Sequence, residues 1–249
     1  MGKLTGKVAL VTGASKGIGA AIARALAAEG AAVAVNYAGD EAGARAVVAD
    51  VESAGGKAIA VRGSVTEPAD VLRIFDQTRS AFGPVDILVN NAGVYKFASI
   101  ENSTVDEYRR QFDTNVLGVI LATQQAVRHF GDRGGAIINI SSTASQRNPP
   151  GTTIYAGTKG AVDTMTHVLA KELASRNIRV NAISPGTVET EGSRSAGIIG
   201  SDFERNAVAA TPLGRLGRPD DIAPVAVFLA SDDAKWITGE LILASGGLR

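Results

Sequence analysis

The sequence predicts an α/β domain in which helices cover both faces of a parallel sheet, the doubly wound arrangement. Short apolar runs alternate with helix-sized segments from the first residues to the last. That alternation is the pattern of right-handed βαβ crossovers, which build parallel sheets. No repeat, linker or change of composition divides the chain, so we expect one domain over residues 1–249.

The expected strands are short runs rich in Val, Ile, Leu and Ala. A strand buried on both faces favours such continuous apolar runs over strict alternation. Seven runs qualify, so we expect a seven-stranded sheet. They cover residues 7–12, 32–36, 57–61, 85–90, 136–141, 178–184 and 241–243.

The expected helices lie between these runs. Segments 17–29, 41–54 and 67–82 are each followed by glycine, a common helix stop. The later helices are expected over residues 104–130, 154–175 and 219–230. Thr104-Val105-Asp106-Glu107 matches a capping box, which predicts the start of the first of these. Residues 186–212 show no clear period and are expected to be irregular.

The composition excludes several classes of function. Lys plus Arg and Asp plus Glu are 25 each, so no net charge recruits nucleic acid or an anionic membrane. The chain has no cysteine, and neither of its two histidines belongs to a metal-spaced cluster, so we expect no metal site. No signal-peptide core and no apolar run near the ~20 residues of a membrane helix occurs. We therefore expect a cytoplasmic protein without membrane contacts.

A glycine-rich loop follows the first expected strand. Ligands of doubly wound folds bind beyond the carboxyl ends of the strands. The loop Thr12-Gly13-Ala14-Ser15-Lys16-Gly17-Ile18-Gly19 also opens the first helix. Its glycines permit a tight turn and the close approach of a pyrophosphate, which a helix N-terminus attracts. The spacing differs from G-x-G-x-x-G, but the position predicts a dinucleotide site.

The second strand bears on the choice of dinucleotide. A site for NAD usually has Asp or Glu about 20 residues after the loop, to hold the ribose 2′-hydroxyl. Here Asn36 and Tyr37 are neutral, and Lys16 adds a positive charge to the loop. An ammonium without a nearby carboxylate suits a 2′-phosphate. We therefore expect NADPH to be preferred over NADH.

Tyr155 and Lys159 stand four residues apart on an expected helix, so their side chains share one face. Tyrosine has an ordinary pKa of about 10 and is a weak acid or base near neutrality. A nearby ammonium favours the phenolate, so we expect Lys159 to lower the pKa of Tyr155. Ser142 lies upstream, at the end of the fifth expected strand.

Several motifs in order give the chain a family resemblance. They are the glycine loop, Asn90-Asn91-Ala92-Gly93, Asn115, Ser142, Tyr155-x-x-x-Lys159 and Pro185-Gly186. From about residue 3 to residue 247, the chain resembles the short-chain dehydrogenase/reductase family. The resemblance implies a Rossmann-type fold and hydride transfer between a nicotinamide cofactor and a carbonyl or alcohol.

The resemblance implies a role for each catalytic residue. Tyr155 would exchange a proton with the substrate oxygen, and Ser142 would hydrogen-bond the carbonyl. Lys159 would hold the nicotinamide ribose and lower the tyrosine pKa, while Asn115 would anchor a water in the proton relay. A ketone that accepts hydride develops negative charge on oxygen, which two hydroxyl groups can stabilise and protonate.

The loop, the strand ends and the resemblance together predict the cofactor contacts. Many relatives carry Asp-Val after the third strand, where this chain has Ser64-Val65, so the adenine contact departs from the family pattern. The expected contacts are Gly13, Ser15, Lys16, Gly17, Ile18, Gly19, Asn36, Tyr37, Ser64, Val65, Asn91, Ala92, Gly93, Tyr155, Lys159, Pro185, Gly186, Val188 and Thr190.

The substrate is expected to lie in a mostly apolar pocket under a lid. Glycines at 186, 192, 197 and 200 suggest that residues 187–205 form that lid. The expected contacts are Val94, Tyr95, Ser142, Ala144, Tyr155, Val188, Ile198 and Ile199. A hydrophobic ketone fits such a pocket, and the reverse reaction would oxidise an alcohol.

Three alternatives remain at this stage. A 3-oxoacyl-acyl-carrier-protein reductase would share the catalytic residues, and Arg128, Arg133, Arg176 and Arg179 could dock its acidic carrier protein. A sugar dehydrogenase would use the same residues in the oxidative direction. A non-catalytic NADP-sensing module would need no proton donor. The resemblance also implies a homotetramer that associates through the two long helices.

Overall fold

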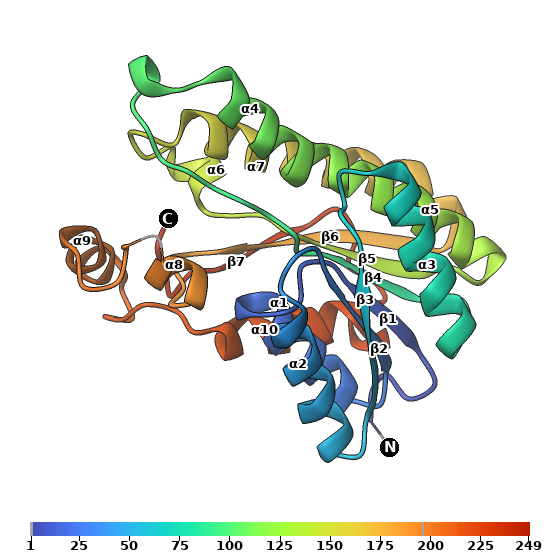
Figure 1. Ribbon diagram of the computed structural model, residues 1–249. Coiled ribbons are helices and arrows are strands. Elements are labelled where there is room, and N and C mark those ends of the chain that lie inside the picture. The colour runs from blue at the N-terminus through green and yellow to red at the C-terminus, as the bar shows by residue number, and fades with distance from the viewer. Residues whose placement is uncertain (1, 196) are drawn as a thin grey trace.

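The protein is built on one seven-stranded parallel sheet, as expected (Figure 1). The computed structural model describes residues 2–195 and 197–249. Met1 of the expected domain and Ala196 of the expected lid lie outside the described residues. The strand order is β3-β2-β1-β4-β5-β6-β7, so the order reverses next to β1. Parallel folds bind ligands at that reversal, beyond the strand ends.

The strands form where the apolar runs predict them. β1 is buried along its whole length, because helices cover the sheet on both sides. Neighbouring strands stay in regular parallel register, as between β1 and β4. The strands are β1 (Val8–Val11), β2 (Ala32–Tyr37), β3 (Lys57–Arg62), β4 (Ile87–Asn90), β5 (Gly135–Ile140), β6 (Ile178–Pro185) and β7 (Leu241–Ala244).

Two layers of helices enclose the sheet (Figure 1). One layer holds α1 (Gly17–Ala28), α2 (Glu41–Ser53) and α10 (Pro219–Ala230). The other holds α3 (Pro68–Phe82), α4 (Val105–Phe112), α5 (Gly118–Phe130) and α7 (Thr153–Leu173). Each layer buries its own cluster of hydrophobic side chains against the sheet. The hydrophobic effect therefore fixes the positions of both layers.

The helix expected over residues 104–130 contains an interruption. A π-helical turn, Asp113–Leu117, separates α4 from α5. Such turns insert an extra residue into a helix and often mark functional sites. A Cβ on Gly118 would lie 2.7 Å from the Val65 side chain, so only glycine permits this close packing. Asn115 lies in this turn and is buried.

Residues 186–212 are more regular than the sequence predicts. They contain α8 (Glu191–Ser195) and α9 (Asp202–Ala210), and a one-turn helix, α6 (Ala144–Arg147), precedes α7. These helices are short, and none of the α9 residues is buried, so no apolar periodicity could reveal them. Figure 1 shows α8 and α9 projecting beyond the carboxyl ends of the strands.

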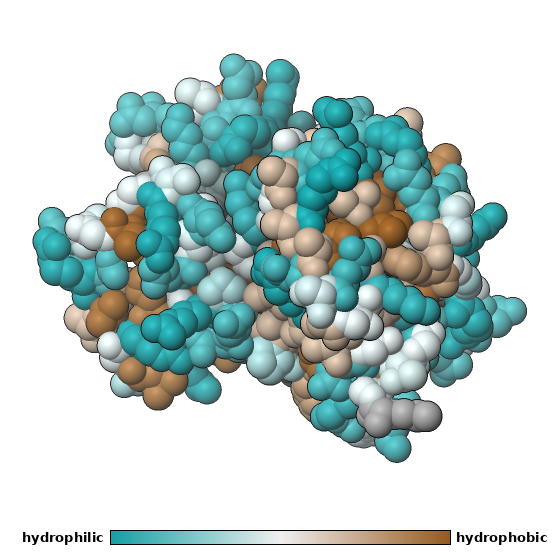
Figure 2. Space-filling model, turned by 60° about the horizontal axis from the view of Figure 1, so that its bottom comes forward, coloured by the Kyte–Doolittle hydropathy of each residue, from teal (hydrophilic) through white to brown (hydrophobic). Residues whose placement is uncertain are grey.

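The outer surface is mixed in character. Figure 2 shows a face on which hydrophilic residues predominate and hydrophobic residues form separate patches. Within residues 2–195 and 197–249, no helix combines the length and apolar character needed to cross a lipid bilayer.

Candidate active site

The glycine loop is fastened to the segment after β4. Thr12 Oγ1 accepts hydrogen bonds of 3.0 Å from the backbone N–H groups of Asn91 and Ala92. Asn91 Nδ2 in turn donates to the carbonyls of Thr12 and Gly13, both at 2.9 Å. The Asn-Asn-Ala-Gly motif therefore has a structural function as well as a place at the site.

Two glycines of the loop are required by this packing. Gly13 has φ +60°, and a Cβ there would lie 2.8 Å from Ala92 Cα. A Cβ on Gly19 would lie 2.3 Å from Asn91 Nδ2. At these glycines the loop therefore exposes backbone rather than side chains. The N-terminus of α1 lies in the same loop. Such a cradle fits the pyrophosphate of a dinucleotide.

Asn36 fastens the glycine loop to the neighbouring strand ends. Its side chain is buried, and its Oδ1 accepts from the Gly13 N–H at 3.2 Å. Its Nδ2 donates to the carbonyls of Val61 and Gly63 at 3.2 and 3.0 Å. The amide thus joins the ends of three strands, and both of its hydrogens are used. Asn36 also lines the cleft beside the glycine loop, so its expected contact with the cofactor stays a prediction.

Lys16 lies at the mouth of the loop, as expected, but it is not without a neighbouring acid. Its Nζ is 3.9 Å from Asp40 Oδ2, and just over half of the lysine side chain is exposed. Asp40 caps α2 by accepting from the Gly43 N–H at 3.0 Å. Asp40 follows the end of β2 by three residues, and no local sequence pattern indicates that its carboxylate approaches Lys16.

The expected cofactor residues surround two adjoining hollows. A cleft of about 670 Å³ is lined by those of the glycine loop, together with Asn36, Tyr37, Ser64, Val65, Asn91, Ala92, Gly93 and Thr190. A second cavity is lined by Tyr155, Lys159, Pro185, Gly186 and Val188. Ile18, Asn91, Gly93, Tyr95 and Thr190 line both, so the two hollows are continuous. An extended ligand can span them.

α8 reaches across to the glycine loop. Glu191 Oε2 accepts a 3.1 Å hydrogen bond from the Gly17 N–H. A Cβ on Gly17 would lie 3.4 Å from the Thr190 side chain, so the two segments are nearly in contact. The segment after β6 thus borders both the loop and the cavity.

Tyr155, Lys159 and Ser142 meet in the second cavity. Helix α7 carries the tyrosine and the lysine one turn apart, and Ser142 follows β5. Lys159 Nζ lies 5.8 Å from the centre of the Tyr155 ring and donates to the Ile140 carbonyl at 2.8 Å. Ser142 Oγ accepts from the Ala144 N–H at 3.1 Å, which orients its hydroxyl.

The electrostatics differ from the expectation. Burial raises the pKa of Tyr155 to about 12, and a hydrogen bond with Ser142 acts in the opposite direction. Burial lowers the pKa of Lys159 to about 8, against the attraction of Asp163. The predicted lowering of the tyrosine pKa by Lys159 is therefore wrong for this structure. The ammonium is directed to the Ile140 carbonyl, and desolvation of the phenolate dominates.

Asn115 joins the site to the segment after β4. Its Oδ1 accepts from the Val94 N–H, and its Nδ2 donates to the Val94 carbonyl, both at 2.8 Å. The second amide hydrogen reaches Thr158 Oγ1 at 3.1 Å, on the tyrosine helix. A Cβ on Gly93 would lie 3.4 Å from the Asn115 oxygen and 3.7 Å from Lys159 Nζ. Asn115 and Lys159 therefore both lie close to Gly93.

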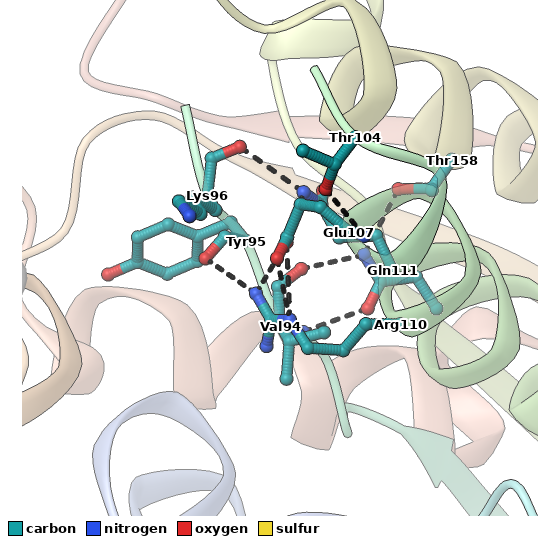
Figure 3. A network of polar contacts seen from close by, with 9 residues as sticks. Val94, Tyr95, Lys96, Thr104, Glu107, Arg110, Gln111 and Thr158 are labelled. Carbon is teal, nitrogen blue, oxygen red and sulfur yellow. Dashed lines mark hydrogen bonds and ion pairs between the residues drawn. The ribbon is translucent and has the colours of Figure 1, made fainter. Parts of the chain in front are cut away.

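Helix α4 holds the next two residues of the same segment (Figure 3). Arg110 and Gln111 donate to the carbonyls of Tyr95 and Lys96, each at 3.2 Å. Glu107 accepts from both donors, at 2.7 and 2.8 Å. The sequence suggested only a capping box here. Thr104 Oγ1 does accept from the Glu107 N–H at 3.2 Å, but the Glu107 carboxylate turns to the arginine and glutamine instead.

The cavity around Tyr155 has a volume of about 400 Å³. Tyr95, Ser142, Ala144, Val188 and Ile198 line it, as expected for a substrate site. Two other expected contacts do not. Val94 lines the neighbouring cleft, because Asn115 holds its backbone on that side. Ile199 lines neither hollow, although its neighbour Ile198 lines the cavity.

Aromatic rings that the sequence analysis missed form one wall of the cavity. Phe97 stacks on Tyr95 with ring centres 5.4 Å apart, and it meets the Tyr155 ring edge-on at 5.8 Å. Phe203, on α9, lies 6.4 Å from Phe97. No sequence pattern indicates that a single phenylalanine in an irregular segment will line a cavity. Only the fold brings these rings from three parts of the chain together.

The arginines that could dock an acidic carrier protein lie far from the cavity around Tyr155. Arg133 pairs with Asp86 at 2.5 Å, and Arg176 donates to the Val127 carbonyl at 2.8 Å. Both follow long helices and precede strands, so they lie at the amino ends of β5 and β6. Tyr155 lies beyond the opposite ends, about 20 Å away along a six-residue strand. The arginines of the alternative carrier-protein dock are therefore not at the entrance of the cavity.

Comparisons with known proteins agree with this geometry. A family model described as enoyl-(acyl carrier protein) reductase matches residues 13–249. An uncharacterised oxidoreductase of Methylorubrum extorquens is 59% identical over 249 residues, all of both chains.

Solved structures are similar over nearly the whole chain. A doubly substituted short-chain dehydrogenase/reductase of Serratia marcescens is 40% identical, with a TM-score of 0.92 over 99% of each chain. A blue fluorescent protein from a metagenomic library, solved in complex with NADPH, is 38% identical, with a TM-score of 0.92 over 99% of each chain.

Proposed function

The chain belongs to the short-chain dehydrogenase/reductase family, and from this premise we propose that it reduces ketones with NADPH and oxidises alcohols in reverse. It is an oxidoreductase acting on carbonyl or CH–OH groups, in a family that uses nicotinamide cofactors. One observation carries the proposal: Tyr155, Ser142 and Lys159 line a cavity continuous with the glycine-loop cleft.

The proposed mechanism assigns the proton to Tyr155. When bound, the reduced nicotinamide supplies the hydride. The Ser142 and Tyr155 hydroxyls donate hydrogen bonds to the carbonyl oxygen, where negative charge develops. With its pKa raised to about 12, Tyr155 stays protonated near neutrality and can give its proton to the alkoxide.

Lys159 and Asn115 support the two hydroxyl groups of Ser142 and Tyr155. Lys159 would bind the nicotinamide ribose and bring a positive charge toward the phenolate that forms. Asn115 fixes the segment after β4 against α7 through Val94 and Thr158. We also assign it the proton-relay water, and we propose that residues 187–205 close over the substrate. The short helix α8 already touches the glycine loop through Glu191.

The preference for NADPH is supported by Lys16. Lys16 lines the cleft together with Ser15 and Tyr37, and its ammonium would pair with a phosphate on the adenosine ribose. Asp40 weakens this argument without cancelling it, because the 3.9 Å pair is exposed and such pairs are weak. The similar NADPH-bound structure is consistent with the preference.

The decisive experiment replaces Tyr155 with phenylalanine. The variant keeps the ring that packs on Tyr95 and Phe97 but removes the proton donor. We expect ketone reduction to fall by about 10²-fold or more, since general acid catalysis contributes on that scale. NADPH binding, followed by cofactor fluorescence, should be retained. A variant with full turnover would overturn the role of Tyr155 as proton donor. A wild-type protein that binds NADPH but reduces no ketone would instead favour a cofactor-sensing module.

A further inference from the structure

The cavity around Tyr155 has an uneven charge. Two of its lining residues are cationic, Lys159 and Arg147, and none of the described lining residues is an aspartate or glutamate. Lys159 is buried at the base, and its ammonium donates to the Ile140 carbonyl. A low-dielectric cavity of this sign attracts anions and repels cations.

Arg147 is the cation that remains available to a ligand. It ends α6, and its backbone N–H donates to the Thr143 carbonyl at 2.9 Å. Asn148 follows in the left-handed conformation, with φ 49°, which ends the helix there. Within the described part of the chain, the Arg147 guanidinium has no ion pair and no hydrogen bond. Its backbone is thus fixed, while its charged group has no partner among the described residues.

α6 joins this arginine to the reacting centre. Ser142 lies two residues before α6, and its Oγ accepts from the Ala144 N–H at the start of that helix. Three residues of helix separate Ala144 from Arg147, a rise of about 4.5 Å. A substrate whose carbonyl meets Ser142 can therefore place a group near Arg147 only if its body spans part of the cavity.

The aromatic residues that line the cavity indicate the chemical character of the middle part of the substrate. Phe97 and Phe203 line the cavity, yet they are 40% and 46% exposed. Large exposed rings beside a cavity favour an apolar ligand that covers them. Because the ring of Phe97 stacks on that of Tyr95, the wall is well suited to the flat face of an aromatic group.

We propose that the natural substrate is an aromatic ketone with a carboxylate, and that the Arg147 guanidinium binds the carboxylate. This deepens the proposed function and rests on it. The planar guanidinium presents paired donors that match the two oxygens of a carboxylate. Phe97 and Phe203 cover the ring, Tyr155 and Ser142 hold the ketone, and Arg147 selects for the acid.

The test compares two ketones of similar shape, 4-acetylbenzoate and acetophenone. The readout is the ratio of their kcat/KM values with NADPH, which cancels effects common to both substrates. We expect the wild-type ratio to favour the acid and Arg147→Gln to lower it about tenfold, the scale of one charge-assisted hydrogen bond. Arg147→Lys should keep part of the ratio, because it retains the charge but not the fork.

Arg109→Gln is the matched control. Arg109 is an exposed arginine on α4 that does not line the cavity, so its loss should leave the ratio unchanged. Added salt should lower the wild-type ratio toward that of Arg147→Gln. Thermal unfolding of each variant checks that the fold is retained.

The outcomes separate the two proposals. Equal ratios in the wild type and Arg147→Gln, with both ketones turned over, overturn the role of Arg147 and leave the reductase standing. If neither ketone is turned over, calorimetric binding of 4-acetylbenzoate to the protein with NADP replaces the rate. Binding weakened about tenfold in Arg147→Gln would support the anion site, and unchanged binding would overturn it.

Discussion

At the scale of single residues, the site combines groups whose environments alter their ordinary chemistry. Tyr155 is a stronger base and a weaker acid than free tyrosine, because burial disfavours its phenolate. Lys159 loses its proton more readily than an exposed lysine for the same reason. The reduction needs a protonated tyrosine, so its high pKa suits that direction, while alcohol oxidation should speed up as the pH rises.

The shifted pKa of Lys159 predicts a change of stability with pH. An unfolded lysine has a pKa of about 10.4, whereas the folded value is about 8. Between these values the unfolded chain binds more protons, so the free energy of unfolding should rise with pH. Lys159→Met should lack this rise. Urea unfolding at several pH values from 7.5 to 10 measures it, and parallel curves for the two proteins would contradict the assignment.

Lys16 and Asp40 give a paired prediction about the cofactor. Lys16→Ala should raise the KM for NADPH about tenfold, the scale of one charge-assisted contact, and leave that for NADH nearly unchanged. Asp40→Asn should have the opposite effect on NADPH, because it removes the carboxylate 3.9 Å from the ammonium. Steady-state kinetics with both cofactors distinguish the cases. Equal losses with NADPH and NADH in Lys16→Ala would count against a 2′-phosphate contact.

At the scale of elements, helix α4 serves as a support for the segment that carries Tyr95. Glu107 fixes Arg110 and Gln111, which hold two carbonyls of that segment (Figure 3). Its carboxyl pKa lies below the ordinary value, mainly because of the hydrogen bond from Arg110. The carboxylate is therefore charged throughout the neutral range.

Removal of this support should affect substrate binding more than chemistry. Glu107→Ala is expected to raise the KM for a ketone roughly tenfold with a smaller change in kcat, because the Tyr95 wall loses its anchor. Asp106→Ala is the matched control, since Asp106 precedes it in the same helical turn and is exposed. An equal rise of KM in both variants would show that only helix stability is involved.

At the scale of the whole molecule, the helical layer holding α5 and α7 presents an apolar groove outward. The groove measures about 550 Å³ and contains Ile120 and Val168, which are 39% and 54% exposed. Exposed apolar surface of this kind marks an interaction site. We propose that it joins copies of the chain into the homotetramer implied by the family.

A charge in this groove should prevent assembly. Val168→Glu is expected to lower the mass measured by light scattering after size-exclusion chromatography, because a buried unpaired carboxylate is costly at an interface. Val105→Glu provides the control, since Val105 is 64% exposed on α4 and does not line the groove. A wild-type protein that elutes as a monomer would refute the tetramer directly.

Much of the fold could be predicted from the sequence, because it depends on local periodicity and turn chemistry. The parts predicted in this way are the strands, the glycine loop and helices α1, α2, α3, α7 and α10. Those patterns also predict that Tyr155 and Lys159 share a helix face, and the order of strand ends gathers most cofactor residues. Motif spacing can be read directly from the sequence, because it depends only on the order of residues in the chain.

Only the tertiary structure decided the rest, because packing partners distant in sequence leave no local trace. Neighbouring elements determine the hydrogen bonds of Asn36, the short distance between Asp40 and Lys16, and the π-helical turn at Asn115. So does the raised pKa of Tyr155, since burial is a property of the assembled fold. The aromatic wall and Arg147 come from separate segments of the chain, and only folding brings Phe97, Arg147 and Phe203 to one cavity.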